Sequence, residues 1–572
     1  MTGMADNPAD LLPELLLLAG AVAGLLAGLF LPRDRQRLVA WICGLALAGA
    51  LAATAVAAFR PDMMAFEAFS VDPLTHVARA TVIVATLLVV VLAGGWARGR
   101  RREAELYVLV LLAALGAIML AGAADLLVLV AAYLLASIPA YALAGFAKDG
   151  PGVEAALKYY LMGAFLGVLM LAGVTLFYGL AGTTAYQGLG QARGGAAGLA
   201  VVLLLAGLLF KAGGVPAHFW VPDVTEGASR VVAAFVTTVP KAGAFVALLR
   251  VAVEVFAGLD VGWRPLVAIV AAATMTLGNL AAFHQDNVRR LLAYSTVSQA
   301  GYLLVPVAMA GGSELAGPAL LFYVAAYAIT NVGAFAVVVA VGRESLAGYA
   351  GLSRGSPVLF LALVVCLLGL VGTPPTAVFV GKVLVFAAAW DAGYAWLAAL
   401  AAINTVASVF YYLRWIRPAL RPGEAVPAAR PAAVVACVAA ALSLVLGLGS
   451  GLVLLLRPGV PAVPAVRSGT PAHHPVGLAA GVLDRGHDEA LLHRPVGEHA
   501  HPAVRQVHVD ADHSRDQGQL ALHRLDAFCT AAGVQSGDVV GDEAVDKRDH
   551  GLLRSAVQGL GMAASWLGRT LF

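Results

Sequence analysis

The sequence predicts an all-α polytopic membrane protein with about fourteen transmembrane helices. Of the 572 residues, 60% are hydrophobic and 12% are charged, and the mean hydropathy is +0.84. Apolar runs of about 20 residues, the length that crosses a bilayer, follow one another through most of the chain. Helices are expected because backbone exposed to lipid must satisfy its own hydrogen bonds. This composition excludes a soluble protein, and the small net charge of +3 has no basic block that suggests nucleic acid.

The apolar windows give the order of the helices. They occupy residues 11–31, 38–59, 74–97, 106–122, 125–146, 158–180, 198–214, 231–254, 264–283, 291–310, 317–341, 357–387, 394–416 and 431–456. Because Asp6 and Asp10 but no Lys or Arg precede the first run, we expect it to be a retained helix and not a cleaved signal peptide.

Two of these helices are interrupted, and they lie five apart in the order. The seventh runs into Gly213, Gly214 and Pro216, and the twelfth is broken by Pro374 and Pro375. Broken helices at corresponding places in two halves are typical of inverted-repeat transporters. We therefore expect helices 4–8 and 9–13 to form two inverted five-helix repeats.

Basic residues in the loops predict the orientation. With the N-terminus outside the cell, one set of loops holds eighteen Lys and Arg residues and the other set holds five, which are Arg60, Arg193, Arg250, Arg264 and Arg457. Cytoplasmic loops carry the excess of positive charge. Both ends of the transmembrane domain are therefore expected to be extracytoplasmic.

After Arg457 the composition changes. We expect residues 1–457 to form the transmembrane domain, and residues 458–572, which are rich in His, Arg, Pro and Asp, to be a disordered tail. The last run, from Leu552 to Phe572, has the pattern of a short amphipathic helix. The histidines of the tail lack the spacing of a metal site, and the four cysteines are scattered without CxxC spacing, so no metal site is expected.

Three lysines inside apolar runs are the candidate functional residues. The chain has only six lysines, yet Lys211, Lys241 and Lys382 lie within predicted helices. A lysine at the centre of a bilayer helix costs roughly 2.5–3.5 kcal/mol on insertion scales. Lysine, unlike arginine, loses its proton readily when it is desolvated. The pattern favours a proton relay, with snorkelling of the side chains to the lipid headgroups as the alternative.

Other polar residues have simpler interpretations. Asp72, His76 and Arg79 are expected to line the membrane interface, and Glu154 and Lys158 to form an i, i+4 pair at a helix start. A second set, Gln299, His284 and Tyr294, either extends the polar path or serves hydrogen bonding between helices.

Several strings, read together, resemble the N subunits of bacterial proton-pumping NADH:quinone oxidoreductase, respiratory complex I. They are EAALKYYLMGA from Glu154, FKAGGVPAHFWVPDVTEGA from Phe210, VRRLLAYSTVSQAGYLL from Val288, GLVGTPPTAVFVGKVLVF from Gly369 and NTVASVFYYLR from Asn404. The resemblance covers roughly residues 10–456. The sequence strings VPAHFWVPDV and GTPPTAVFVGK favour the N subunit over the other antiporter-like subunits.

The resemblance implies a proton-translocating membrane-arm subunit in the plasma membrane of a bacterium. Lys211, Lys241 and Lys382 match the family's relay lysines, and His218 matches its histidine after the seventh-helix break. Other membrane-arm subunits of complex I and the lipid bilayer are the implied partners. NAD, FMN, iron–sulfur clusters and quinone belong to partner subunits, so this chain is part of an enzyme without a cofactor of its own.

One family residue does not match. The family's fifth-helix glutamate, which pairs with the seventh-helix lysine, aligns with Leu134 when its serine and tyrosine are set on Ser137 and Tyr141. Lys211 then lacks the carboxylate that would hold its proton. Two alternatives stay open: a structural membrane subunit with an impaired channel, and a subunit of a multisubunit sodium/proton antiporter.

Overall fold

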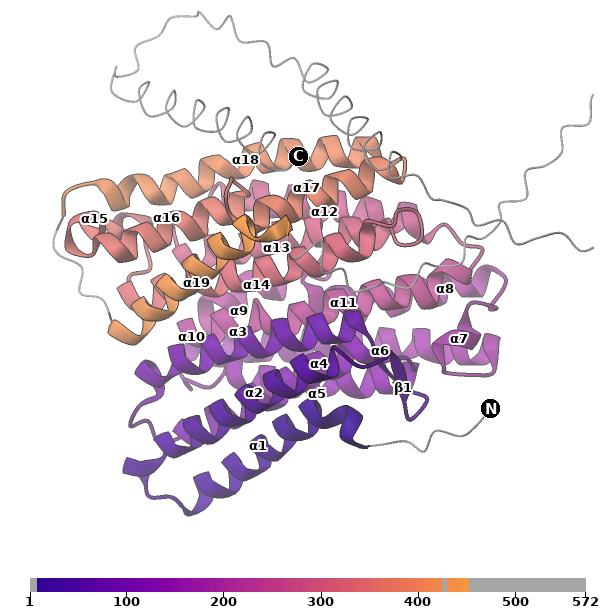
Figure 1. Cartoon of the computed structure of the whole chain (residues 1–572). Helices are drawn as coiled ribbons and strands as arrows, with labels where there is room; N and C mark the ends of the chain where they lie inside the picture. Colours follow the sequence, from indigo (N-terminus) through magenta and orange to yellow (C-terminus); the bar gives the residue numbers. More distant parts are fainter. Residues whose placement is uncertain (1–7, 424–428, 452–572) are drawn as a thin grey trace, which may run out of the picture. The chain divides into compact units, whose positions relative to one another are not determined.

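A computed structural model describes residues 8–423 and 429–451, which are almost entirely helical. Long helices run side by side, as Figure 1 shows. The predicted tail, with its amphipathic segment and its histidines, lies outside the described residues.

Thirteen spans of the described residues are long and apolar enough to cross a membrane: twelve unbroken helices and the interrupted span Arg230–Gly258. The broken pair α16 and α17 adds the fourteenth. The unbroken spans are α1 (Leu12–Phe30), α2 (Arg37–Ala57), α3 (Pro73–Ala97), α4 (Glu103–Gly122), α5 (Leu126–Ala144), α6 (Gly150–Ala181), α8 (Gly195–Ala212), α12 (Trp263–Ala282), α13 (Val288–Ala308), α14 (Ala316–Val341), α18 (Ala395–Leu420) and α19 (Arg430–Leu448). Every predicted window overlaps one of the observed helices or a broken pair, which confirms the all-α polytopic fold.

Both predicted interruptions are present. The seventh helix ends with α8 at Ala212 and resumes as α9 (Trp220–Gly227), and the twelfth is divided into α16 (Pro357–Val371) and α17 (Ala377–Asp391). At each break a glycine takes the left-handed conformation that ends a helix, with φ of 75° at Gly213 and 88° at Gly372.

The eighth helix, which the window 231–254 located, is broken as well, and this break was not predicted from the sequence. It consists of α10 (Arg230–Val236) and α11 (Val239–Glu254), separated by Thr237 and Thr238. Pro240, the second residue of α11, has no N–H to donate and its ring crowds the preceding turn, which disfavours a continuous helix. This proline therefore favours an interruption of the helix at this point.

Short elements fill the predicted loops. A hairpin of β1 (Met63–Ala65) and β2 (Phe69–Val71) pairs Met63 with Val71, and the Phe69 ring lies where a β-carbon on Gly122 would be. The remaining short helices are η1 (Pro8–Leu11), η2 (Arg33–Arg35), α7 (Tyr186–Leu189), η3 (Phe256–Gly258), η4 (Leu346–Tyr349) and α15 (Leu352–Gly355).

Helix α14 has a central position. It packs against α3, α10, α11, α13, α16, α17 and α19, and it lies between the violet and orange helices in Figure 1. The residues of α10, α11, α13 and α14 are almost all buried, whereas α1, α2 and α6 expose one apolar side. Polar side chains on the central helices are consequently removed from lipid.

Candidate functional site

Lys211 lies at the end of α8, directly before the first break, and its side chain is buried. Its ammonium donates to the hydroxyl of Ser137 on α5 over 2.7 Å and lies 5.6 Å from the centre of the Tyr133 ring. A hydroxyl oxygen and an aromatic face, the latter offering a cation–π contact, therefore surround this amine.

Lys241 is the third residue of α11, directly after the break in the eighth helix. It is buried and donates to the hydroxyl of Thr296 on α13 over 3.2 Å. A β-carbon placed on Gly213 would lie 2.7 Å from its ammonium nitrogen. The glycine that ends α8 thus makes room for this lysine, and the break after Lys211 is brought against Lys241.

Lys382 lies in α17 and is also buried. It donates to the carbonyl of Val371 over 2.8 Å and reaches the Thr405 hydroxyl at 3.4 Å. The Tyr302 ring centre is 4.1 Å from its nitrogen. A β-carbon on Gly372 would lie 2.8 Å from the lysine Cδ, so the second break glycine also makes room for a lysine.

The three lysines share one chemical property. Within residues 8–423 and 429–451, each hydrogen-bonds only to neutral oxygens and none forms an ion pair. A permanently charged buried amine is normally stabilised by a carboxylate. Neutral partners, by contrast, accept from either the ammonium or the amine. The alternative, snorkelling to the headgroups, is not what the side chains do, because all three are less than 3% exposed.

Polar side chains join the pockets of Lys241 and Lys382. Helix α13 carries Thr296, Gln299 and Tyr302 at three-residue spacing, which places them along one side of the helix. The Gln299 amide donates to the carbonyl of Leu370 over 2.8 Å and accepts from the Tyr323 hydroxyl of α14. The Leu370 carbonyl precedes the Val371 carbonyl that holds Lys382. Gln299 therefore lies between the two lysine pockets.

The other residues of that predicted set lie elsewhere. His284 is exposed and its ring contacts the carbonyl of Leu280 at 3.3 Å within its own helix. Tyr294 is half-buried and packs against the apolar core. For these two residues the structure gives no link to the lysines.

His218 lies in the segment between α8 and α9 and is buried at 6% exposure. Its ring is stacked at an angle against Phe219, with 4.6 Å between the ring centres. Its Nδ1 has no hydrogen-bond partner among the described residues. A buried imidazole nitrogen of this kind is available to take or give a proton.

The fifth helix presents two different sides near Lys211. Tyr133 and Ser137 are buried at 1% exposure and face the lysine, whereas Leu134 is 48% exposed. The missing carboxylate therefore corresponds to a position on the outer side of α5. The contacts of Lys211 come from Ser137 and Tyr133 instead.

A charged cluster connects α9 with α6 and α13. Asp223 accepts from Lys158 at 2.8 Å, and Lys158 also pairs with Glu154 at 2.7 Å. Arg290 donates to Glu226 at 2.7 Å. The predicted Glu154 pair is present, and the additional partners anchor the segment that follows the first break.

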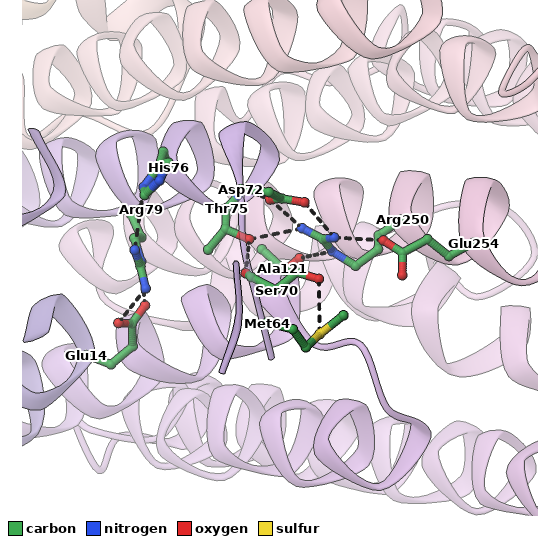
Figure 2. Close-up of polar contacts among 10 residues, drawn as sticks. All are labelled: Glu14, Met64, Ser70, Asp72, Thr75, His76, Arg79, Ala121, Arg250 and Glu254. Atoms are coloured by element: carbon green, nitrogen blue, oxygen red, sulfur yellow. Dashed lines mark hydrogen bonds and ion pairs between the residues drawn. The ribbon is translucent and has the colours of Figure 1, made fainter. Parts of the chain in front are cut away.

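Of Asp72, His76 and Arg79, which were expected to line the membrane interface, Arg79 does not line it, and the other two are half-buried at the start of α3. Arg79 is fully buried and makes two hydrogen bonds to Glu14 of α1 at 2.7 and 2.8 Å, with the His76 ring 3.5 Å away. Figure 2 shows this pair beside a second buried network. These charges hold helices together because the apolar surroundings leave them no other partners.

The second network in Figure 2 centres on Arg250, which is 1% exposed and not in a loop. All five of its N–H groups donate over 2.8–3.0 Å: two to Asp72, one to Glu254, one to the Thr75 hydroxyl and one to the Ala121 carbonyl. The C-terminal part of α11 is thereby fastened to α3 and α4. Glu254 lies four residues from Arg250, but the other partners are more than a hundred residues away in the sequence, so local patterns did not indicate them.

Comparison with known proteins places this arrangement in a family. The transmembrane family described as NADH:quinone oxidoreductase/Mrp antiporter matches residues 123–408. NADH-quinone oxidoreductase subunit N 1 of Streptomyces griseus subsp. griseus is 53% identical over 79% of this chain and 98% of its own length. The subunit N of Mycobacterium sp. strain JLS is 52% identical over 78% of this chain and 98% of its own length.

Solved structures show the same fold. A chain of respiratory complex I from Thermus thermophilus is 37% identical, with a TM-score of 0.69 over 77% of this chain and 98% of that chain. A chain of the Mrp complex from Dietzia sp. shares the fold at 23% identity, with a TM-score of 0.68 over 79% of this chain and 96% of that chain. The chain belongs to the NADH-quinone oxidoreductase subunit N family, within the antiporter-like transmembrane proteins.

Proposed function

We propose that the chain is a proton-translocating membrane-arm subunit of an NADH:quinone oxidoreductase. Its relatives bear that complex's name, and one chain of the same fold belongs to respiratory complex I. Its partners would be the other membrane-arm subunits, and NAD, FMN, iron–sulfur clusters and quinone would be bound by other subunits. The setting would be the plasma membrane of a bacterium, with both ends of the transmembrane domain extracytoplasmic.

One observation carries the proposal: three buried lysines, each at or near a helix break, have neutral hydrogen-bond partners only. In low-dielectric surroundings a change of charge on one amine is felt strongly by the next. Protonation of one lysine therefore favours the neutral form of its neighbour. This repulsion would move protons in sequence when other subunits supply the driving force.

The contacts support one order for the proposed relay. The Lys241 ammonium lies beside Gly213, in the break that follows Lys211. Gln299 lies between the pockets of Lys241 and Lys382. His218, with a free ring nitrogen in the same segment as the first break, would exchange protons near Lys211 and Lys241. The hydroxyls of Ser137, Thr296 and Thr405 would hold whichever form of each amine is present.

Lysine substitution tests the proposal. Lys241→Ala and Lys382→Ala are expected to lower the number of protons moved per electron in vesicles, with the subunit still assembled. Lys158→Ala is the matched control, because Lys158 is 45% exposed and paired with carboxylates. The proposal is refuted if both buried-lysine variants translocate protons at the parental ratio.

A structural subunit with an impaired channel is the second candidate. Leu134, on the exposed side of α5, and the lack of a carboxylate at Lys211 favour it. Leu134→Glu distinguishes the two. A raised proton-to-electron ratio in this variant would support the impaired channel, and a parental ratio that is already normal and does not change would dismiss it.

A sodium/proton antiporter subunit is supported less well. The relatives of highest identity reported above are N subunits at 52–53%, whereas the chain of the Mrp complex is 23% identical. The neighbouring genes decide between these two assemblies, because the operons encode different partner subunits.

A further inference from the structure

The break in the eighth helix is held by side chains of α14. The amide nitrogen of Asn331 donates to the hydroxyls of Thr238 and Thr237, at 2.8 and 3.2 Å. The Tyr327 hydroxyl donates to the carbonyl of Thr237 over 2.8 Å. Asn331, Thr237 and Thr238 are 0% exposed. Two residues one turn apart on α14 thus bind both side chains and one carbonyl of the break.

This clamp is close to Lys241 in sequence and in space. Thr238 precedes the lysine by three residues, and α14, which carries Tyr327 and Asn331, packs against both α11 and α13. Lys241, Tyr327 and Asn331 therefore belong to one buried polar group formed by α11, α13 and α14.

The Asn331 carbonyl oxygen is a second, independent sign of function. It is buried and has no hydrogen-bond partner among the described residues. Buried side-chain acceptors are normally paired. Among the described residues, the clamp therefore leaves one acceptor free in the pocket beside Thr238.

We propose that Asn331 and Tyr327 are positioning residues for Lys241: by holding helix eight open at Thr237 and Thr238, they fix the ammonium between Gly213 and Thr296. This inference rests on the proposed function of Lys241. Closing the break would add helical backbone before the lysine and turn its side chain away from these partners. The clamp therefore sets where Lys241 can exchange its proton.

The substitutions Asn331→Leu and Tyr327→Phe test the clamp in the assembled complex. Asn331→Leu is expected to lower the proton-to-electron ratio and to shift the pH profile of proton translocation. Tyr327→Phe removes one hydroxyl and should give the same changes in weaker form. It also keeps the test decisive if Asn331→Leu prevents assembly. Asn331→Gln, which retains the amide, should recover part of the ratio.

Thr330→Val is the matched control on the same helix. Thr330 is equally buried, but its hydroxyl bonds Ala326 and Ser443 on another side of α14. A parental pH profile in Tyr327→Phe and in any assembled Asn331 variant, or an equal change in Thr330→Val, would overturn the proposal. Lys241→Ala is measured in parallel. If it retains the parental ratio, the proposed function fails; if it alone loses translocation, only the clamp fails.

Discussion

The ammonium of Lys211 donates to the hydroxyl of Ser137 over 2.7 Å, whereas the family resemblance implied a carboxylate partner for this lysine. A hydroxyl accepts a hydrogen bond but brings no opposing charge. The first lysine of the row is therefore held by geometry rather than by an ion pair. This relationship makes the role of Ser137 testable.

Ser137→Ala should impair the relay at its first lysine. Removing the acceptor leaves a buried donor unsatisfied, at a cost of about 1–3 kcal/mol, and lets Lys211 take other rotamers. A reduced proton-to-electron ratio with normal assembly is expected. Thr175→Ala is the control, because the exposed Thr175 hydroxyl bonds only the Leu171 carbonyl of its own helix. Equal ratios in both variants would dismiss a role for Ser137.

Gly213→Ala should lower thermal stability and proton translocation by more than the backbone strain alone would. A residue other than glycine in the left-handed region costs roughly 1–2 kcal/mol, and here the new methyl group would also lie 2.7 Å from the Lys241 nitrogen. Gly182→Ala isolates the backbone effect, because Gly182 has a φ of 70° with no atom within 4 Å of an added β-carbon. Thermal stability and proton translocation are compared in the two variants. Similar losses in both would show that the lysine contact is unimportant.

Arg250→Leu should destabilise the subunit through its buried carboxylates. Breaking a buried ion pair by removing one partner costs about 3–5 kcal/mol, and Asp72 and Glu254 would both lose their cation. The thermal unfolding temperature of the purified complex and the amount of subunit in membranes measure the effect. Arg60→Leu is the control, because Arg60 is 57% exposed and pairs with Asp10 at 3.7 Å. Unfolding temperatures that fall equally would contradict the prediction.

The same network predicts a pH dependence of stability. Burial raises the pKa of Asp72, but the hydrogen bonds and charge of Arg250 outweigh it and lower the pKa below its ordinary value. The stabilisation is therefore complete above the ordinary carboxyl pKa and is lost as the pH falls through the lowered pKa. Asp72→Asn should have a flatter acid limb in a plot of unfolding temperature against pH. An unchanged acid limb would argue against this contribution.

Labelling of single cysteines tests the predicted orientation. Gly150 and Gly195 are exposed, and neither has an atom within 4 Å of an added β-carbon. With an impermeant maleimide added outside intact cells, Gly195→Cys should react and Gly150→Cys should not, in a background without the natural cysteines. The reverse pattern would invert the topology.

Much of the fold was predictable because hydrophobic length and Gly/Pro signals are local. The windows located the helices, and Gly213 and Pro374 marked two breaks that the structure confirms. The break before Lys241 was missed although Pro240 signalled it, because a proline in an apolar run is also compatible with a simple kink.

The partners of the candidate site could not be predicted in the same way. Ser137, Thr296 and Thr405 are ordinary helix residues in sequence, and only packing brings them to the lysines. The partnership of Arg79 with Glu14 spans 65 residues. Long-range pairs of this kind depend on helix order in space, which periodicity does not specify.

The most direct test is the proton-to-electron ratio of Lys382→Arg in vesicles that hold the assembled complex. Arginine keeps the positive charge and the ability to donate to the Val371 carbonyl, but it does not release a proton. If the buried lysines carry protons, the variant assembles and its ratio falls as far as that of Lys382→Ala. A parental ratio in Lys382→Arg would show that only the charge is needed and would contradict the relay.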